Sequence, residues 1–317
     1  MNRIKHWLLA AAGSLLFAGA AQAAAPFAKT QAPGFYRMML GDFEVTALFD
    51  GAIDLKPTEL LTNVKAQDVT KMLGQNFEKE PLPTSVNAFL VNTGSKLVLI
   101  DTGTGALGGP TLGGIVNNLK AAGYQPDQVD EVYITHMHFD HVGGLMSGET
   151  MTFPNAIVRA DQHDADYWLS QANLDKAPEA MKSFFTGAQA SLNPYVAANK
   201  FKAFDGNTDL VPGVKAVAAH GHTAGHSIYV VESKGQKLVL WGDLMHVAAV
   251  QFPRPEVTIQ FDSDSKAAMA QRKKAFADAA KQGYLVGLAH LPFPGIGHLR
   301  ADGKGYRFLP VDYTPVK

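Results

Sequence analysis

Four potential metal ligands fall within six consecutive residues of this chain: His136, His138, Asp140 and His141. His136 and His138 are two residues apart, so on an extended backbone their side chains point to the same side. Residues 131–135 are rich in β-branched and aromatic side chains, which predicts a strand that ends at the histidines. Because the chain holds only 11 histidines in 317 residues, three of them in this stretch indicate a metal site and not merely a polar loop.

A cluster of this kind needs partners elsewhere, since zinc, manganese, iron and cobalt each take four or more ligands. Three downstream segments offer them. His222 and His226 belong to a Gly-His-Thr-Ala-Gly-His run. Asp243 follows an apolar strand predicted over residues 237–241, and His290 follows a further apolar run. The four segments together make a strong prediction of a metal centre.

The order of these motifs, H-x-H-x-D-H, G-H-T-x-G-H, an Asp after a strand and a late His, resembles the metallo-β-lactamase superfamily. The resemblance implies an α/β fold, the αβ/βα four-layer sandwich, with ligands on loops at one end of two packed sheets. It also implies two divalent metal ions per chain, zinc first, with manganese, cobalt or iron as alternatives. The implied ligands are His136, His138 and His222 for one ion, Asp140, His141 and His290 for the other, and Asp243 as a bridge.

The implied chemistry is direct attack by a water or hydroxide that bridges the two metals, because two divalent ions lower the pKa of bound water. The catalytic candidates are Asp140, Asp243 and His246. His246 follows Asp243 by three residues and would polarise a carbonyl or protonate a leaving oxygen; the alternative is a residue packed at the pocket rim. Asp101, in an Asp-Thr-Gly loop, and His226 are expected to orient ligands without binding metal, although Asp101 also suits a simple turn.

The resemblance is closer to one branch of the superfamily. Residues 34–44, 90–99, 191–195 and 289–300 look like the corresponding segments of the methyl parathion hydrolases. Two departures matter: His246 stands where phosphotriesterase members carry an aliphatic residue, and residues 105–109 lack an expected aromatic.

These departures favour a hydrolase of lactones or aryl esters, such as dihydrocoumarin-like aryl lactones, with a secondary organophosphate triesterase activity. The alternative is methyl parathion hydrolase activity proper. A remote alternative from another class is a non-catalytic metal-binding module on this fold.

The expected substrate pocket is apolar and aromatic around one polar group. Its predicted lining is Leu60, Leu61, Trp168, Phe184, Phe185, His246, Ile259 and Phe261, although core packing is the competing explanation for each apolar member. Three other histidines, His163, His220 and His298, are expected to be structural or solvent-facing.

The first 23 residues have the features of a secretory signal peptide. A basic start is followed by an apolar stretch and by Ala21-Gln22-Ala23, which fits the small-x-small cleavage rule. We therefore expect cleavage near Ala23, a single hydrolase domain over residues 24–317, and a periplasmic or secreted protein with no membrane contact after cleavage. A homodimer is expected from the resemblance alone.

Composition narrows the possible partners. The chain has no cysteine, which excludes disulfides and cysteine metal ligands, and its formal net charge of -1 includes no basic block. This argues against nucleic acid and leaves a small-molecule lactone, ester or phosphotriester as the expected substrate.

Periodicity and turn residues predict the main elements. An antiparallel pair is expected to turn at Gly41-Asp42, and a hairpin to turn across residues 92–95. Helices are expected over residues 67–77, 112–122, 161–170 and 263–281, with one or two more over 176–199 that are interrupted near Pro194.

Overall fold

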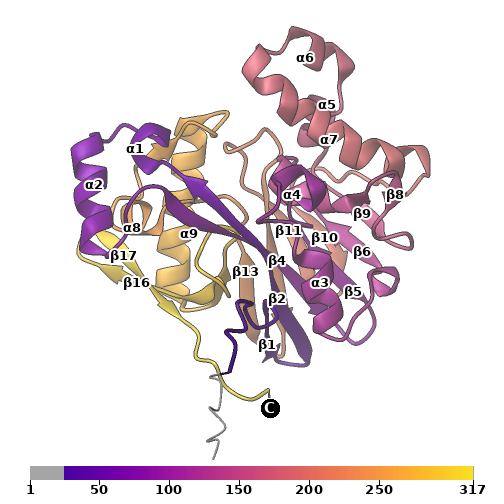
Figure 1. Ribbon diagram of the computed structural model, residues 1–317, viewed down its shortest axis with the longest axis horizontal. Coiled ribbons are helices and arrows are strands. Elements are labelled where there is room, and N and C mark those ends of the chain that lie inside the picture. Colours follow the sequence, from indigo (N-terminus) through magenta and orange to yellow (C-terminus); the bar gives the residue numbers. More distant parts are fainter. Residues whose placement is uncertain (1–24, 317) are drawn as a thin grey trace, which may run out of the picture. The chain divides into compact units, whose positions relative to one another are not determined.

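Two β-sheets form the centre of the structure, a computed structural model that describes residues 25–316 (Figure 1). The first sheet consists of β1 (Phe35–Leu40), β2 (Phe43–Leu55), β4 (Leu82–Asn92), β5 (Leu97–Ile100), β6 (Glu131–Tyr133) and β9 (Ile157–Arg159), in that spatial order. The second consists of β10 (Thr208–Val211), β11 (Val214–Ala218), β12 (Ser227–Ser233), β13 (Gln236–Leu240), β15 (Leu285–Gly287), β16 (Ile296–Asp302) and β17 (Gly305–Pro310). Two short pairs complete the strands: β3 (Leu61–Thr62) with β14 (Thr258–Ile259), and β7 (Met146–Ser147) with β8 (Thr150–Met151).

Helices cover the outer faces of both sheets. They are α1 (Pro57–Leu60), α2 (Ala66–Gln75), α3 (Ile115–Ala121), α4 (Phe139–Val142), α5 (Gln162–Trp168), α6 (Gln171–Lys176), α7 (Glu179–Ala197), α8 (Ala248–Gln251) and α9 (Ser265–Gln282). Figure 1 shows α3 and α7 on one side of the paired sheets and α9 on the other.

Three apolar layers hold this arrangement together. The inner faces of the sheets meet in a buried cluster that includes Val45, Phe89, Tyr229 and Leu238. The outer face of the first sheet packs against α3, α5 and α7. The outer face of the second sheet packs against α9, where the rings of Trp241 and Phe276 stack with centroids 5.2 Å apart. The α/β four-layer sandwich predicted from the motif order is therefore confirmed.

Several element predictions are confirmed in detail. β1 and β2 pair antiparallel, with Leu40 opposite Phe43 across the turn. Asp264 caps α9 by accepting from the amides of Lys266 and Ala267, and Gly283 ends that helix in the left-handed conformation. A carboxylate at the N-cap and a glycine after the last turn are the expected boundaries of a helix.

Two helix predictions are corrected. α7 is continuous through Pro194, because Leu192 and Tyr195 on either side are buried in the core, and this packing outweighs the amide that proline lacks. α3 begins at Ile115 and not at Leu112. The Asp50 carboxylate accepts from the amides of Gly113 and Ile115, which holds the preceding turn outside the helix.

The remaining chain-level predictions concern the beginning of the chain and its assembly. Pro33–Lys317 forms one compact unit, and residues 25–32 form neither helix nor strand. The predicted signal peptide lies outside the described residues, so its cleavage, the cell compartment and the homodimer stay predictions. Within residues 25–316 we find no helix with the length and apolar character needed to cross a membrane.

Candidate metal centre

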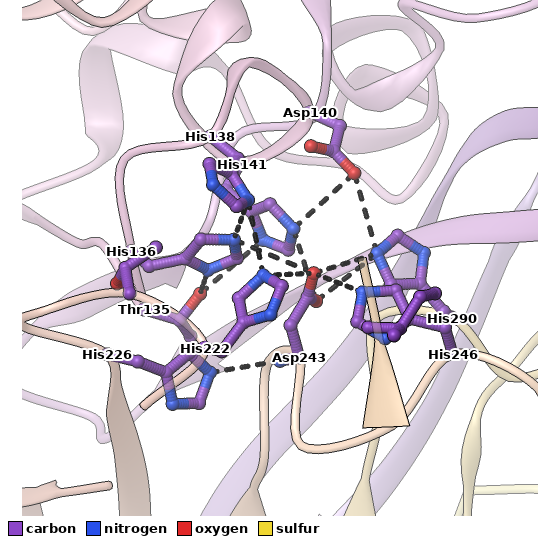
Figure 2. A network of polar contacts seen from close by, with 12 residues as sticks. Thr135, His136, His138, Asp140, His141, His222, His226, Asp243, His246 and His290 are labelled. Atoms are coloured by element: carbon purple, nitrogen blue, oxygen red, sulfur yellow. Dashed lines mark hydrogen bonds and ion pairs between the residues drawn. The ribbon is translucent and has the colours of Figure 1, made fainter. Parts of the chain in front are cut away.

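The predicted ligands come from loops at one end of the two sheets. β11 and β13 are both antiparallel to β12, and β15 is parallel to β13, so these three strands run in the same direction. Their carboxyl ends lead to His222, Asp243 and His290 respectively. The loop after β6 and the short α4 supply the other four, so segments up to 154 residues apart in sequence meet at a single site (Figure 2).

The first ligand group is His136, His138, His222 and Asp243. One donor atom from each lies within 4.8 Å of the others, and all four residues are buried. His136 Nε2 is 3.0 Å from His138 Nδ1, which in turn is 3.2 Å from His222 Nε2. The three imidazoles therefore converge on one point.

The second group is Asp140, His141 and His290, whose donor atoms also lie within 4.8 Å of one another. Asp140 Oδ2 is 3.5 Å from His141 Nε2 and 3.4 Å from His290 Nε2. This is the same division into two groups that the sequence motifs imply.

Asp243 lies between the two groups (Figure 2). Its Oδ2 is 3.6 Å from His136 Nε2 and 3.3 Å from His222 Nε2. Its Oδ1 is 3.2 Å from the Nε2 atoms of both His141 and His290. His290 Nε2 is also 3.2 Å from Oδ2, so the carboxylate contacts both groups, as a bridging ligand would.

The donor set fits two divalent ions on two observations. The buried atoms His141 Nε2 and Asp243 Oδ1 have no hydrogen-bond partner within the described part of the chain, although they are only 3.2 Å apart. Ligand atoms of a tetrahedral zinc ion, with bonds of about 2.0 Å, are roughly 3.3 Å apart, which is close to the spacings found here. Imidazole and carboxylate donors suit zinc, manganese, cobalt and iron.

The three imidazoles of the first ligand group differ in protonation: two are neutral, and the third carries a proton that a metal would displace. Burial holds the pKa of His136 and His138 well below the usual value, so both imidazoles are neutral. Burial acts in the same direction on His222, but its hydrogen bonds to Asp243 and Asp262 outweigh it and raise the pKa to about 9. A metal bound by His222 would have to release that proton.

The two residues expected to orient ligands lie beside them. Asp101 accepts from the Thr135 amide at 2.8 Å and pairs with His141 Nδ1 at 2.8 Å. His226 Nε2 accepts from the Asp243 amide at 3.0 Å, while its Nδ1–H donates to the Ala219 carbonyl. Burial lowers the pKa of His226 to about 3, which keeps this neutral tautomer in place. Gly242 has φ +51°, and a Cβ there would lie 2.9 Å from His226 Nε2, so only glycine fits before Asp243.

Sequence reasoning missed three further supporting groups. The Ser85 carbonyl accepts from His290 Nδ1 at 2.9 Å, and the Asp262 carboxylate lies 3.0 Å from His222 Nδ1. Asp164 accepts from the amides of Met137 and Gly225 and therefore ties two ligand loops together. Asp262 directly precedes a predicted helix and Asp164 lies within another, positions that do not indicate a contact with a ligand loop, and a backbone carbonyl leaves no signal in the sequence.

Comparison with known proteins agrees with this geometry. The family model of the metallo-beta-lactamase superfamily matches residues 81–290, which include all seven predicted ligands. The chain belongs to the metallo-beta-lactamase superfamily.

Among solved structures, the chain is similar to hydrolase AbOPH, at 38% identity over 90% of this chain and 100% of the other, with a TM-score of 0.85. It is also similar to AidC, a dizinc quorum-quenching lactonase, at 27% identity over 89% of this chain and 99% of the other, with a TM-score of 0.83. An N-acyl homoserine lactonase from Bacillus sp is 31% identical over 130 residues, 40% of this chain. That match spans 42% of the relative's own length, less than half of it.

A cavity lies against the predicted ligands. It measures about 100 Å³ and touches His138, Asp140, Asp243 and His290. Its remaining lining is Ile53 and Leu55 of β2, Thr84 of β4, Phe139, Phe184 of α7, His246 and Phe261.

Of the eight residues predicted to line the substrate pocket, three border this cavity and five do not. Phe184, His246 and Phe261 line the cavity, but Trp168 and Phe185 are buried in the core under the first sheet. Leu60, Leu61 and Ile259 pack in a separate apolar cluster with α2 and α8. Ile53, Leu55 and Thr84 take their place, since β2 and β4 extend beyond the sheet to form a wall.

The other histidines lie outside this centre. His163 and His220 both pair with the buried Asp161, at 2.8 Å and 3.3 Å. His298 is exposed, and its Nδ1 lies 3.0 Å from the Gly283 carbonyl.

Proposed function

We propose that this protein is a binuclear-metal hydrolase of lactones and aryl esters, acting best on compact aryl lactones of the dihydrocoumarin type. The observation that carries the proposal is the cavity. Its lining brings four of the predicted ligands, His138, Asp140, Asp243 and His290, together with His246 and an apolar wall. The named activities of AidC and of the Bacillus lactonase, both lactonases, support the same class of substrate.

Each ligand residue has a definite task in this proposal. One ion would be held by His136, His138 and His222. The other would be held by Asp140, His141 and His290, and Asp243 would bind both ions. Two divalent ions bound there would supply an activated water at neutral pH and polarise the carbonyl that it attacks. No serine, threonine or cysteine nucleophile is required.

His246 is suited to act on the substrate itself. Its side chain is buried, its Nε2 is 3.0 Å from Asp243 Oδ2, and its Nδ1 has no hydrogen-bond partner within the described residues. Burial lowers the pKa of His246 despite the adjacent Asp243 carboxylate, so the ring is neutral with one N–H. The N–H lies on Nε2, facing Asp243 Oδ2; with the Asp243 oxygens bound to metal it would be free to donate to the carbonyl or to the leaving oxygen as negative charge develops there.

The shape of the cavity favours a planar ester over a phosphotriester. A flat lactone ring can lie between Phe184 and Phe261, whereas a tetrahedral phosphotriester would be crowded by His246 beside the bridging carboxylate. A shallower hollow shares Phe139 and Phe184 with the cavity and continues along α7, so a substituent on the lactone has a path outward.

The test is a comparison of kcat/KM for three substrates on metal-replete protein: dihydrocoumarin, N-hexanoyl homoserine lactone and methyl paraoxon. We expect the aryl lactone to be hydrolysed fastest and the phosphotriester slowest. A phosphotriester rate above both lactone rates would contradict the proposal in favour of methyl parathion hydrolase activity. Two bound metals with no hydrolysis of any of the three would favour a metal-binding module.

A further inference from the structure

The loop between β14 and α9 contacts both the backbone and the side chain of the His222 segment. The Ser263 amide donates to the His222 carbonyl at 2.9 Å, and the Asp264 amide donates to the Gly221 carbonyl at 2.8 Å. Asp262 Oδ1 lies 3.0 Å from His222 Nδ1. The loop therefore fixes where the His222 backbone lies and also which way its ring faces.

The start of α9 can approach this closely only because residue 221 is a glycine. Gly221 has φ +143°, and a Cβ built there would lie 2.3 Å from the amide nitrogen of Ala268 in the first turns of α9. Any side chain at 221 would push the helix away from the ligand loop. The Gly-His pair thus couples His222 to α9 directly.

Asp262 is itself held by buried groups. Its Oδ2 accepts from the Ile259 amide at 3.3 Å and lies 4.0 Å from Nη2 of Arg272 on α9. The Arg272 side chain is only 2% exposed and donates through Nη1 to the Val257 carbonyl at 2.8 Å. Its Nε has no hydrogen-bond partner within the described residues.

Stability alone explains this arrangement poorly. Removing an arginine and an aspartate from water is costly, and a buried ion pair often stabilises a fold no better than well-packed apolar residues would. A separation of 4.0 Å and an unpartnered Nε make this pair a weak one. The charge of Arg272 instead lies behind a carboxylate whose other oxygen faces a predicted metal ligand.

We propose that Asp262 is a positioning residue for the metal centre. Asp262 would accept the Nδ1–H of His222, fix the ring's tautomer and leave Nε2 directed at the first ligand group, 3.3 Å from Asp243 Oδ2. The inference rests on the proposed function in that His222 binds metal, and it adds α9 to the structural support of that site.

One consequence is specific to this network: the two ligand groups should depend on Asp262 unequally. His222 belongs to the first group, while His141 and His290 of the second group are oriented by Asp101 and by the Ser85 carbonyl. Loss of Asp262 should therefore weaken one metal site and spare the other.

The chain supplies a matched control two residues away. Asp264 lies on the same loop, but its carboxylate caps α9 by accepting from Lys266 and Ala267 and does not touch His222. Asp264→Ala should weaken the helix start without releasing the ring. Asp262→Asn, nearly the same size as the native residue, covers the case in which Asp262→Ala fails to fold.

The experiment measures zinc affinity of both sites by chelator competition, the visible spectrum of the cobalt-loaded protein, and thermal unfolding of the metal-free protein. For Asp262→Ala we expect one of two metals to bind roughly 10- to 100-fold more weakly, with the other nearly unchanged. Asp262→Asn should lose less metal affinity than Asp262→Ala, since its amide oxygen can still accept a hydrogen bond from His222. Asp264→Ala should lower the unfolding temperature while leaving both affinities and the cobalt spectrum as in wild type.

Three outcomes would overturn the inference: wild-type affinities in Asp262→Ala, an equal loss at both sites, or an equal loss in Asp264→Ala. Wild-type protein that binds no metal would overturn it as well. Failure of the proposed function looks different. Two metals and the expected loss in Asp262→Ala, without lactone hydrolysis by wild type, would leave the positioning role intact and reject the activity.

Discussion

The metal centre and the cavity wall beside it are built from different kinds of contacts. Four of the five ligand imidazoles have their Nδ1 atoms paired with a fixed oxygen: Thr135 for His136, Asp101 for His141, Asp262 for His222 and the Ser85 carbonyl for His290. The wall is mostly apolar, with side chains such as Ile53, Phe184 and Phe261 that come from separate segments and hold one another only by packing.

This difference indicates that the polar frame determines metal binding and the apolar wall determines which substrate fits. A change in the polar frame leaves a buried donor or acceptor without its partner, so it should disturb metal binding and all activities together. A change in the wall should alter which substrate fits while the metals stay bound. The predictions below test that division, in order of decreasing effect.

The largest effect is expected for Asp243→Asn. Both carboxylate oxygens face ligand groups, so the substitution removes a shared anionic donor from both sites. Loss of a residue that supports a ligand typically lowers metal affinity or activity 10- to 100-fold. Loss of this shared ligand should therefore lower kcat by more than about 100-fold and should also lower the amount of bound metal. Metal content and kcat of the purified variant test this, with the exposed Asp209→Asn as control. Full metal content in Asp243→Asn would contradict the bridging role.

His246→Leu should lower the lactone kcat/KM by about 100-fold, the typical effect of losing one donor to a developing oxyanion. Metal content should stay at the wild-type level, because His246 is outside both ligand groups of the proposal. The phosphotriester rate should not fall, since the His246 ring is expected to crowd that substrate and not to assist it. The exposed His298→Leu is the matched control. An unchanged lactone rate would make His246 only a rim residue.

Two adjacent phenylalanines allow the effect of a wall residue to be compared with that of a core residue. Phe184 lines the cavity, whereas Phe185 is buried in the core beneath the first sheet. Phe184→Ala should raise KM for the aryl lactone by about 10-fold, the equivalent of 1.4 kcal/mol of lost contact, with little change in kcat. Phe185→Ala should leave KM unchanged and destabilise the fold by about 3–5 kcal/mol. Steady-state kinetics and denaturant unfolding distinguish the two, and the reverse pattern would reject the assignment of the wall.

The smallest effect concerns pH. Burial lowers the pKa of His222, but hydrogen bonds to Asp243 and Asp262 outweigh it and raise the pKa to about 9, above the ordinary value of 6.5. A histidine with a raised pKa in the folded state contributes stability below pH 6.5 that is lost as the pH rises through 9. The unfolding free energy of metal-free protein should therefore fall over that range. The fall should be smaller in Asp262→Asn, and equal slopes in both proteins would contradict this coupling.

The clustering of the predicted ligands could be foreseen from the sequence because most of the pattern is local. Two histidines that are two residues apart after a strand point to the same side, and an Asp that follows a second strand lies at the edge of the sheet. The sequence therefore limits where these side chains can point before any tertiary contact is known. Five donors lie in two short motifs, and the strand directions then bring Asp243 and His290 to the same edge.

The cavity wall could not be predicted in the same way. Trp168 and Phe185 are aromatic residues predicted to line the pocket, yet they turn into the core. Ile53 and Leu55 look like ordinary strand residues, and they reach the cavity only because β2 extends past the sheet along β4. Asp262 directly precedes the helix predicted over residues 263–281, but its contact with His222 depends on how closely α9 approaches Gly221.

The most direct test of the two-metal centre is anomalous X-ray scattering at the zinc edge from crystals of zinc-loaded protein. We predict two peaks on either side of Asp243, one bounded by His136, His138 and His222 and the other by Asp140, His141 and His290. A single peak at Asp243, or zinc bound only at the separate Asp161, His163 and His220 group, would contradict the account.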